Sequence, residues 1–304
     1  MSRILSGTGY KYTLFCIKVV SAALKWLPLP PVDASRKITL MGIVNLTDDS
    51  YFAPSRVDIS DGCAGLVRRV AAMKEEGADI IDMGACSTRP GSVPVDAAEE
   101  WRRLAPALKA VSVAFPGTAI SVDTFRASVA GRAYDLIGDF MVNDISAGEA
   151  DKDMLPLVGR LGLRYVAMHM RGTPETMQNL ACYDDVTAEV ASCFRSFALR
   201  AEDNGIADWI LDPGFGFAKT VDQNYELLSN LEVFRGFGRP VLVGVSRKSM
   251  IYRLLGITPE EALPATQVVH FKALENGADI LRVHDVAEAA RTVALYRRLA
   301  HSSI

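Results

Sequence analysis

From Ile38 onward, short apolar runs alternate with longer segments of helical periodicity, almost to the end of the chain. The runs are mostly apolar over their whole length, as strands are when a parallel sheet is covered on both faces. This pattern predicts eight strands. They are Ile38–Val44, Ile80–Met83, Ala119–Val122, Phe140–Asn143, Arg164–Met168, Trp209–Leu211, Val241–Val245 and Ile280–Val283.

The segments between these runs have the length and the polar faces of helices. Eight strands that alternate with helices over about 260 residues match the size of a single-domain (β/α)8 TIM barrel. A doubly wound open sheet is the alternative, but a Gly-rich phosphate loop usually follows its first strand, and here Asn45–Ser50 follows. The expected helices include Val67–Glu76, Ala97–Val113, Ala127–Leu136, Val186–Asn204, Tyr225–Phe234 and Glu260–Asn276.

One short sequence motif repeats at the junctions between helix and strand. Gly77-Ala78-Asp79 and Gly277-Ala278-Asp279 each end a helical segment and lead into a strand, and Gly205–Asp208 does the same with one extra residue. Glycine is a common helix stop because it adopts left-handed backbone angles. The repetition favours a fold built from repeated βα units.

Polar side chains follow every predicted strand. In a (β/α)8 barrel the carboxyl ends of the strands meet on one face, where ligands bind. These side chains should therefore form a ring on that face. They are Asn45, Asp49, Ser50, Thr88, Arg89, Asp123, Thr124, Asn143, Asp144, His169, Arg171, Asp212, Ser246, Arg247, Lys248, Ser249, Arg282 and His284.

The ring contains two kinds of chemistry. One group holds donors suited to phosphate oxygens. The other, Asp123, Asn143 and Asp212, can pair with the edge of a flat nitrogen heterocycle such as a 2-amino-pyrimidinone. Taken alone, Asp212 before Pro213-Gly214 is equally well a turn residue, and Asp144 a supporting one. The phosphate-type donors are Asn45, Thr88, Arg89, Lys248, Ser249, Arg282 and His284.

Composition and charge limit the other possibilities. A net charge of −3 argues against a nucleic-acid partner. Five scattered cysteines indicate reduced thiols in a cytoplasmic protein, and the four histidines form no zinc motif. The apolar stretch Leu14–Leu27 carries Lys18 and Lys25, so it is too charged for a membrane span. Residues 1–35 are expected to be an extension that is loosely attached or non-native, and 36–304 to be the barrel.

Eight segments together resemble the dihydropteroate synthase family. They occur in that family's order and cover nearly all of residues 38–298, with Asp48 and Ala85-Cys86 as departures in two loops. Cys86 is expected to be a small buried filler. The segments are MGIVNLTDDSY (41–51), GADIIDMGACSTRPGS (77–92), SVDT (121–124), VNDISAG (142–148), MHMRGTPETMQ (168–178), LDPGFGFAKT (211–220), PVLVGVSRKS (240–249) and RVHDV (282–286).

This resemblance implies a cytoplasmic, homodimeric barrel that is a sulfonamide target. It would join 6-hydroxymethyl-7,8-dihydropterin pyrophosphate to p-aminobenzoate with the help of Mg²⁺, giving 7,8-dihydropteroate and pyrophosphate. Catalytic roles would fall to Asp123, Lys248 and Arg282. The pterin would contact Asp123, Asn143, Met168, Asp212, Phe217 and Lys248; pyrophosphate, Asn45, Thr88, Arg89, Arg282 and His284; p-aminobenzoate, Thr88, Arg89, Pro90, Phe217, Ser249 and the loop 46–56; and the metal, Asn45.

Two other functions stay open at this point. A methyltetrahydrofolate-dependent corrinoid methyltransferase is a similar pterin-binding barrel, and it would explain Asp123, Asn143 and Asp212. It would not explain the Ser-Thr-Arg-Pro and Ser-Arg-Lys-Ser segments, which supply the phosphate and amine pockets. A non-catalytic pterin-binding relative is the second alternative, and the presence of Asn45, Arg89 and Lys248 argues against it.

Overall fold

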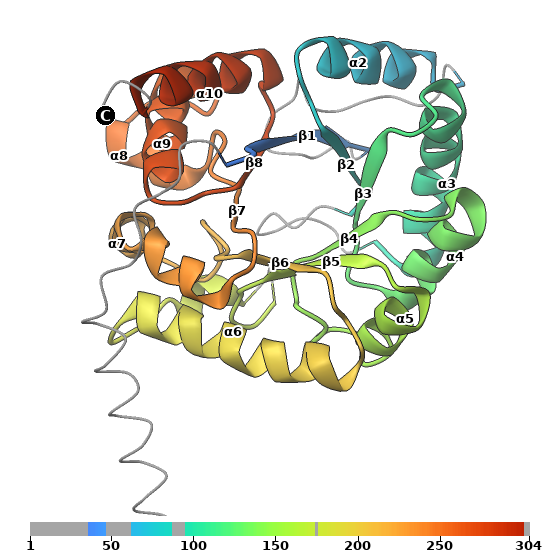
Figure 1. Ribbon diagram of the computed structural model, residues 1–304, viewed down its shortest axis with the longest axis horizontal. Helices are drawn as coiled ribbons and strands as arrows, with labels where there is room; N and C mark the ends of the chain where they lie inside the picture. The colour runs from blue at the N-terminus through green and yellow to red at the C-terminus, as the bar shows by residue number, and fades with distance from the viewer. Residues whose placement is uncertain (1–35, 47–61, 87–94, 174–175, 301–304) are drawn as a thin grey trace, which may run out of the picture. The chain divides into compact units, whose positions relative to one another are not determined.

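The computed structural model describes residues 36–46, 62–86, 95–173 and 176–300 (Figure 1). All eight expected strands are confirmed within these ranges. Seven agree with the expected bounds to within one residue at each end, whereas β7 has only two residues. The strands are β1 (Thr39–Asn45), β2 (Ile80–Gly84), β3 (Ala119–Asp123), β4 (Met141–Asp144), β5 (Arg164–Met168), β6 (Trp209–Asp212), β7 (Leu242–Val243) and β8 (Ile280–Val283).

The strands form one parallel sheet in the order β6-β5-β4-β3-β2-β1-β8-β7. The two outer strands approach each other through a bridge between Leu211 and Val241. Beside it the amide of Leu211 donates to the carbonyl of Pro240 at 3.0 Å. The sheet is thus a nearly closed barrel in sequential order, and the doubly wound alternative is wrong.

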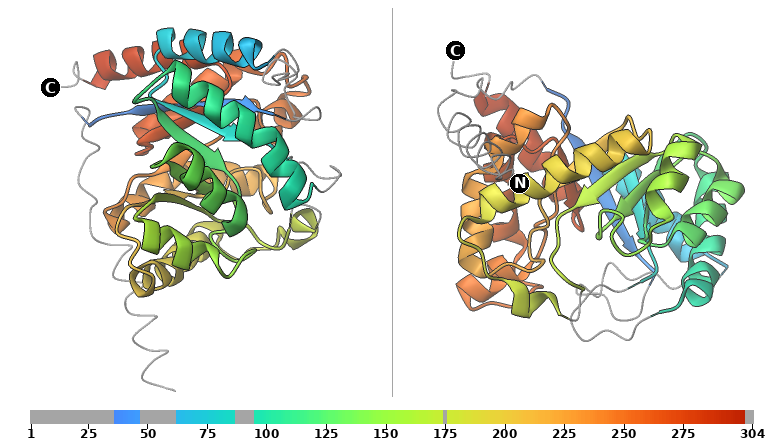
Figure 2. Two further views of the ribbon diagram at one scale, coloured as in Figure 1. Left: turned by 90° about the vertical axis from the view of Figure 1, so that its right-hand side faces the viewer. Right: turned by 90° about the horizontal axis from the view of Figure 1, so that it is seen from below.

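Helices surround the strands (Figures 1 and 2). Three differ from expectation. The helix expected from Val67 starts three residues earlier, at Ala64. The expected helix Tyr225–Phe234 is divided between α7 and η3, which meet at Asn230. A capping box of Thr220 and Gln223 also makes α7 start earlier than expected. Pro264 occupies the first turn of α9, so that helix starts after Glu260. The helices are α2 (Ala64–Glu75), α3 (Ala97–Ala114), α4 (Ala127–Ile137), α5 (Met154–Leu161), η2 (Met177–Leu180), α6 (Val186–Asp203), α7 (Val221–Ser229), η3 (Leu231–Phe237), α8 (Ser249–Leu255), α9 (Leu263–Glu275) and α10 (Val286–Ala300).

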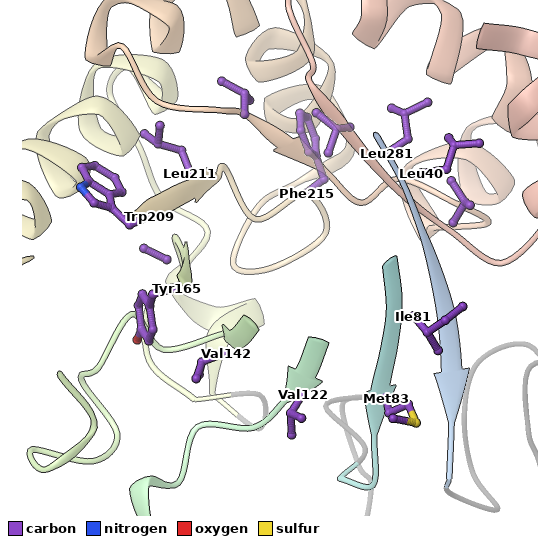
Figure 3. Packing of buried hydrophobic residues seen from close by; sticks show 14 of the residues in the cluster. Leu40, Ile81, Met83, Val122, Val142, Tyr165, Trp209, Leu211, Phe215 and Leu281 are labelled. Carbon is purple, nitrogen blue, oxygen red and sulfur yellow. The ribbon is translucent and has the colours of Figure 1, made fainter. Parts of the chain in front are cut away.

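Two apolar clusters fill the barrel and its surroundings. The larger cluster packs strands against helices and includes Leu40, Ile81 and Tyr165 (Figure 3). The smaller one is separate and takes one residue from each strand except β3, which is the composition of a layer inside the barrel. Its members are Met41, Ile80, Met141, Val166, Ile210, Leu242 and Ile280.

The inner layer determines which residues face the carboxyl-end mouth. Side chains in a strand alternate between its faces, so the residue two positions later points inward again, one layer higher. Counting two residues on from the inner layer therefore gives the side chains at the floor of the mouth. This step leads from Ile80 to Asp82, from Met141 to Asn143, from Val166 to Met168, from Ile210 to Asp212 and from Ile280 to Arg282.

The repeated Gly-Ala-Asp motif stabilises the opposite mouth of the barrel, at the amino ends of the strands. Asp79 accepts a hydrogen bond from the amide of Leu40 at 2.8 Å, and Asp279 accepts one from Val241 at 2.9 Å. Asp279 also pairs with Arg36 at 2.7 Å. Arg36, Asp79 and Asp279 are among the residues that line a cavity of about 810 Å³ at this mouth. It lies at the amino ends of the strands, where a barrel's residues serve stability, so we do not assign it as the active site.

Residues 1–35 lie outside the described residues, and their expected dispensability stays a prediction. Among the described residues, Arg36 is the first that contacts the barrel, and its guanidinium also donates to the carbonyl of Leu274 at 2.7 Å. A chain that begins at Ala34 keeps these contacts, so we expect it to fold and to turn over like the full chain. Purification followed by steady-state kinetics checks this. Insoluble protein, or folded protein without activity, would contradict it.

Across the ranges that the structure describes, none of the helices combines the length and the apolar character needed to cross a membrane.

Candidate active site

An arginine from β8 joins two carboxylates at the floor of the carboxyl-end mouth. Arg282 Nε donates to Asp82 Oδ2 at 2.7 Å, and Arg282 Nη2 lies 2.8 Å from Asp123 Oδ2. Burial acts to lower the pKa of Arg282, but the two carboxylates outweigh it and raise that pKa. Burial raises the pKa of Asp123, an effect that Asp82 strengthens and Arg282 opposes. The strands β2, β3 and β8 are thus joined by one charged group.

Asp82 was not among the expected site residues. It is fully buried, and Asn143 Nδ2 lies 3.3 Å from each of its carboxylate oxygens. The sequence pattern contained a signal for it, because Asp82 interrupts an apolar strand two residues after the inner-layer residue Ile80. A lone carboxylate within such a run needs a buried partner, and Arg282 is that partner.

Asp212 ends β6 and points toward the same mouth. Its Oδ1 accepts a hydrogen bond from the amide of Gly214 at 2.8 Å, and only 7% of the residue is exposed. Burial raises the pKa of this carboxyl, whereas the charge of Lys248, the Gly214 amide and the charges of Arg282 and Lys219 lower it. Asp212 is therefore both a residue of the turn with Pro213-Gly214 and a residue of the mouth.

Lys248 crosses from the segment after β7 to the loop after β6. Its ammonium donates to the carbonyl of Phe215 and lies 4.7 Å from the ring centroid of Phe217. Burial lowers the pKa of Lys248 to about 8, although Asp212 opposes this. Gly216 permits the close approach, because its φ is +81° and a Cβ there would lie 3.2 Å from Lys248 Cδ. Ser249 follows directly as the first residue of α8.

His284 lies just beyond β8 and contacts the segment after β7. Its Nδ1 is 3.0 Å from Ser246 Oγ. Burial lowers the pKa of His284 to about 3, and Arg282 lowers it further, so the imidazole is neutral at pH 7. The neighbouring Arg247 has a φ of 52° and pairs with Asp285 through Nε at 2.8 Å and Nη2 at 3.0 Å. This ion pair ties together the segments that follow β7 and β8.

The remaining strand-end residues divide into those near the mouth and those that support it. Asn45 ends β1 and Met168 ends β5. Asp144 accepts a hydrogen bond from the hydroxyl of Tyr165 at 2.6 Å, which is the supporting role expected for it. Burial raises the pKa of the half-buried Cys86 thiol, and the charge of Glu100 acts in the same direction. The role of Cys86 as a filler stays a prediction.

Three expected site residues cannot be placed. Thr88, Arg89 and Pro90 lie outside the described residues, as does the loop 46–56 after Leu46. Within the described ranges, no group of three His, Cys, Asp or Glu side chains is placed to hold a metal ion. Asn45 offers one amide oxygen at the mouth. That donor suits a magnesium ion that takes its other ligands from water and from substrate phosphates.

Known proteins resemble this chain over nearly the whole barrel. Residues 41–284 match the family of pterin binding enzymes. Dihydropteroate synthase of Escherichia coli K12 is 40% identical over 256 residues, which are 84% of this chain and 89% of that protein. Among solved structures, dihydropteroate synthase of Yersinia pestis in a sulfonamide drug complex aligns with a TM-score of 0.82 at 34% identity, covering 90% of this chain and 97% of that one.

A second solved structure carries a different ligand. Dihydropteroate synthase of Thermus thermophilus in complex with 4-aminobenzoate aligns with a TM-score of 0.76 at 39% identity. The alignment covers 88% of this chain and 96% of that chain. The similarity therefore extends over both the barrel and the strand ends that form the mouth.

Proposed function

The chain belongs to the pterin-binding enzyme family and is a transferase with dihydropteroate synthase activity, and we propose that the strand-end ring described above carries out this reaction. The observation that supports the assignment of the ring is the arrangement of Asp82, Asp123 and Arg282 beside Asp212 and Lys248. It provides buried carboxylates for a heterocycle and cations for an anionic leaving group on one face.

The pterin ring occupies the floor of the mouth in this proposal. Asp212 accepts from the amidine-like edge of the ring, and Asn143 donates and accepts beside it. Asp123 lies beside Asn143, its partner in the pairing of β3 with β4, and Met168 supplies an apolar surface. Lys248 and Phe217 cover the ring from the segments after β7 and β6. The Lys248 ammonium lies 4.7 Å from the centroid of the Phe217 ring, which keeps it near the heterocycle.

Pyrophosphate binds nearer the rim in this proposal. Arg282, His284 and Asn45 approach it from the described strand ends, and Thr88 and Arg89 are assigned to it by family resemblance. A guanidinium has five N–H donors, so Arg282 can contact an oxygen while it still pairs with Asp82. When bound, Mg²⁺ neutralises charge on the leaving group, and Asn45 is the residue that would hold it.

The chain's own residues then position two reactants. The carbon–oxygen bond to pyrophosphate breaks and leaves a pterin methylene cation, which Asp123 stabilises by its charge. The aniline nitrogen of p-aminobenzoate forms the new carbon–nitrogen bond and releases a proton. Because this amine is a weak nucleophile, its placement by Ser249, Pro90 and Phe217 contributes more than a strong base would.

Release of pyrophosphate from the pterin pyrophosphate, measured with and without p-aminobenzoate, tests this function. We expect release that depends on p-aminobenzoate and yields dihydropteroate in equal amount. Methyl transfer from methyltetrahydrofolate to a corrinoid would instead indicate the related methyltransferase. Pterin binding without either reaction would indicate a non-catalytic relative.

Sulfonamide binding should depend on the leaving group. The amine pocket is assigned to two loops that contain Pro and Ser, Leu46–Arg56 and Ala85–Ser92, most of which lies outside the described residues. Both begin beside or contain proposed phosphate ligands, Asn45 and Thr88-Arg89. We expect pyrophosphate with Mg²⁺ to complete the amine pocket and to tighten sulfonamide binding by at least about 1–3 kcal/mol. Titration calorimetry with and without saturating pyrophosphate and Mg²⁺ measures this, and equal affinities would contradict it.

We also infer a homodimer that forms through α8, α9 and α10. Among the described residues, five of the ten exposed large apolar side chains lie on these three helices. Sedimentation equilibrium should give twice the chain mass of 33.0 kDa. The inference is wrong if the mass is that of one chain at micromolar concentration. The five residues are Leu254, Leu255, Val268, Leu295 and Leu299.

A cytoplasmic location completes the proposal. The four cysteines among the described residues are Cys63, Cys86, Cys182 and Cys193, and all have free thiols. Free thiols support a reducing compartment. Fractionation of the native cell, followed by detection of the chain with a specific antibody, checks this, and enrichment in a membrane or organelle fraction would contradict it.

A further inference from the structure

One buried lysine has no place in the reaction described above. Lys219 follows β6 and is only 4% exposed. Its Nζ lies 3.0 Å from His169 Nδ1, 3.0 Å from the carbonyl oxygen of Gly214 and 3.1 Å from that of Phe217. A lysine is almost never this buried unless it is paired, so these three contacts must compensate for the lost hydration.

We propose that Lys219 is a positioning residue for the pterin site, which fixes the turn carrying Asp212 and Phe217 and stabilises the Asp212 carboxylate by its charge. This inference rests on the proposed role of Asp212 in pterin binding.

The three contacts connect the ends of two neighbouring strands. His169 directly follows β5, and its amide donates to the carbonyl of Asp212 at 2.9 Å, which continues the pairing of β5 with β6. Gly214 and Phe217 belong to the turn after β6, where the amide of Phe217 donates to the carbonyl of Gly214 at 3.1 Å. Lys219 occupies the interior of this turn and holds both carbonyls. Loss of its ammonium would leave two buried carbonyls with fewer partners.

The close packing of the turn shows how little freedom it has. A Cβ on Gly214 would lie 1.9 Å from the carbonyl oxygen of His169 and 3.4 Å from Lys219 Nζ, so only glycine fits there. The amide of Gly214 is the donor that holds Asp212 Oδ1 at 2.8 Å. A displacement of this turn therefore moves the Asp212 carboxylate directly.

Charge provides the second half of the role. The charged and titratable groups that face Lys219 are Asp212 and Lys248 at the mouth, His169 and Arg171 after β5, and Cys193 from α6. Burial lowers the pKa of His169 to about 3 and raises that of Cys193, so both are neutral at pH 7. His169 Nδ1 thus accepts a hydrogen bond from the ammonium, and Asp212 is the carboxylate that the lysine faces.

The protonation states of Lys219 and Asp212 favour their interaction below neutral pH. Burial lowers the pKa of Lys219 to about 7, so the ammonium is charged in the acidic range where a carboxylate gains its proton. The cations that face Asp212 are Lys248, Arg282 and Lys219. Removal of one cation raises the pKa of a neighbouring carboxyl, by about one to three units when the two are close. Without Lys219, Asp212 should therefore lose its charge at a higher pH.

Calorimetric titration with 6-hydroxymethylpterin from pH 4.5 to 8.5 tests the proposal. Lys219→Met keeps the length of the side chain and removes the ammonium. We expect its Kd at pH 6, where Lys219 of the wild type is mostly charged, to rise about tenfold. That is the loss of roughly one hydrogen bond to a charged group. We also expect the acid limb of the affinity profile to move up by about one pH unit. Lys109→Met removes an exposed lysine on α3 and should behave like the wild type.

Each outcome separates this inference from the function on which it rests. Wild-type protein that does not bind the pterin would overturn the proposed function. Wild-type binding that Asp212→Asn weakens and Lys219→Met leaves unchanged would overturn the role of Lys219. A tenfold loss with an unmoved acid limb would also overturn it, because a purely structural side chain behaves in that way.

A second variant covers the case in which Lys219→Met does not fold. His169→Leu removes one of the three partners and leaves the ammonium and its charge in place. We expect a Kd for 6-hydroxymethylpterin about threefold higher, with the acid limb at the wild-type pH. An unchanged Kd would show that Lys219 does not hold the turn after β6 to the end of β5.

Discussion

Asp212→Asn should weaken pterin binding by about 2–4 kcal/mol, because buried donors of the ligand lose their charged partner. The amide of Gly214 donates to Asp212 Oδ1 at 2.8 Å. An asparagine would turn its own oxygen toward that amide, which leaves its NH₂ group facing the pterin. A donor would then oppose the donors of the ligand. Calorimetry with 6-hydroxymethylpterin measures the change in Kd.

Asp144→Asn is the matched control for this variant. Asp144 is also a buried carboxylate at the end of a strand, and its partners are the hydroxyls of Tyr165 and Ser146 and the amides of Ser146 and Gly148. We expect this substitution to reduce stability and to leave the pterin Kd near that of the wild type. Near-wild-type affinity in Asp212→Asn would remove Asp212 from the site, and equal losses in both variants would point to general loosening of the barrel.

The sequence predicts the barrel well because its strands are short apolar runs with little competing signal. Their bounds hold to about one residue except in β7, where only Leu242 and Val243 pair as a strand. Closure there depends on the bridge from Leu211 to Val241. That bridge is a contact between distant segments, and local periodicity contains no information on it. The failed helix Tyr225–Phe234 has a local cause, because its start is set by the capping residues Thr220 and Gln223.

The site was predicted less completely than the fold, for a physical reason. Reading the residues at and just after the end of each strand finds groups such as Asp212 and Lys248. Two buried charges were missed, because Asp82 lies within a strand and Lys219 lies in the turn segment well past the end of β6. Arg282, the partner of Asp82, is 200 residues away on another strand, and the imidazole partner of Lys219, His169, follows β5. The alternation of inward and outward residues would have located Asp82, whereas nothing in the local pattern points to Lys219.

Asp82→Asn should lower the free energy of unfolding by about 3 kcal/mol, the lower end of the range for breaking a buried ion pair. Asp82 is fully buried, and Arg282 Nη2 lies 2.6 Å from its Oδ2. Asparagine is nearly the same size but cannot match the charge of the guanidinium. It also faces the NH₂ group of Asn143 with a donor of its own. Asp123 remains as a second partner for Arg282 at 2.8 Å, so the loss stays at the lower end.

Thermal unfolding checks this prediction, with a midpoint that falls by about 5–10 °C. Asp208→Asn is the control, since Asp208 pairs with Arg164 through side chains that are each 52% exposed. Surface pairs contribute about 0–1 kcal/mol, so this midpoint should hardly move. Equal shifts in the two variants would mean that Arg282 does not depend on Asp82. In that case Asp123 alone would hold the guanidinium at the mouth, and the three-strand link from β2 to β8 would not stabilise the barrel.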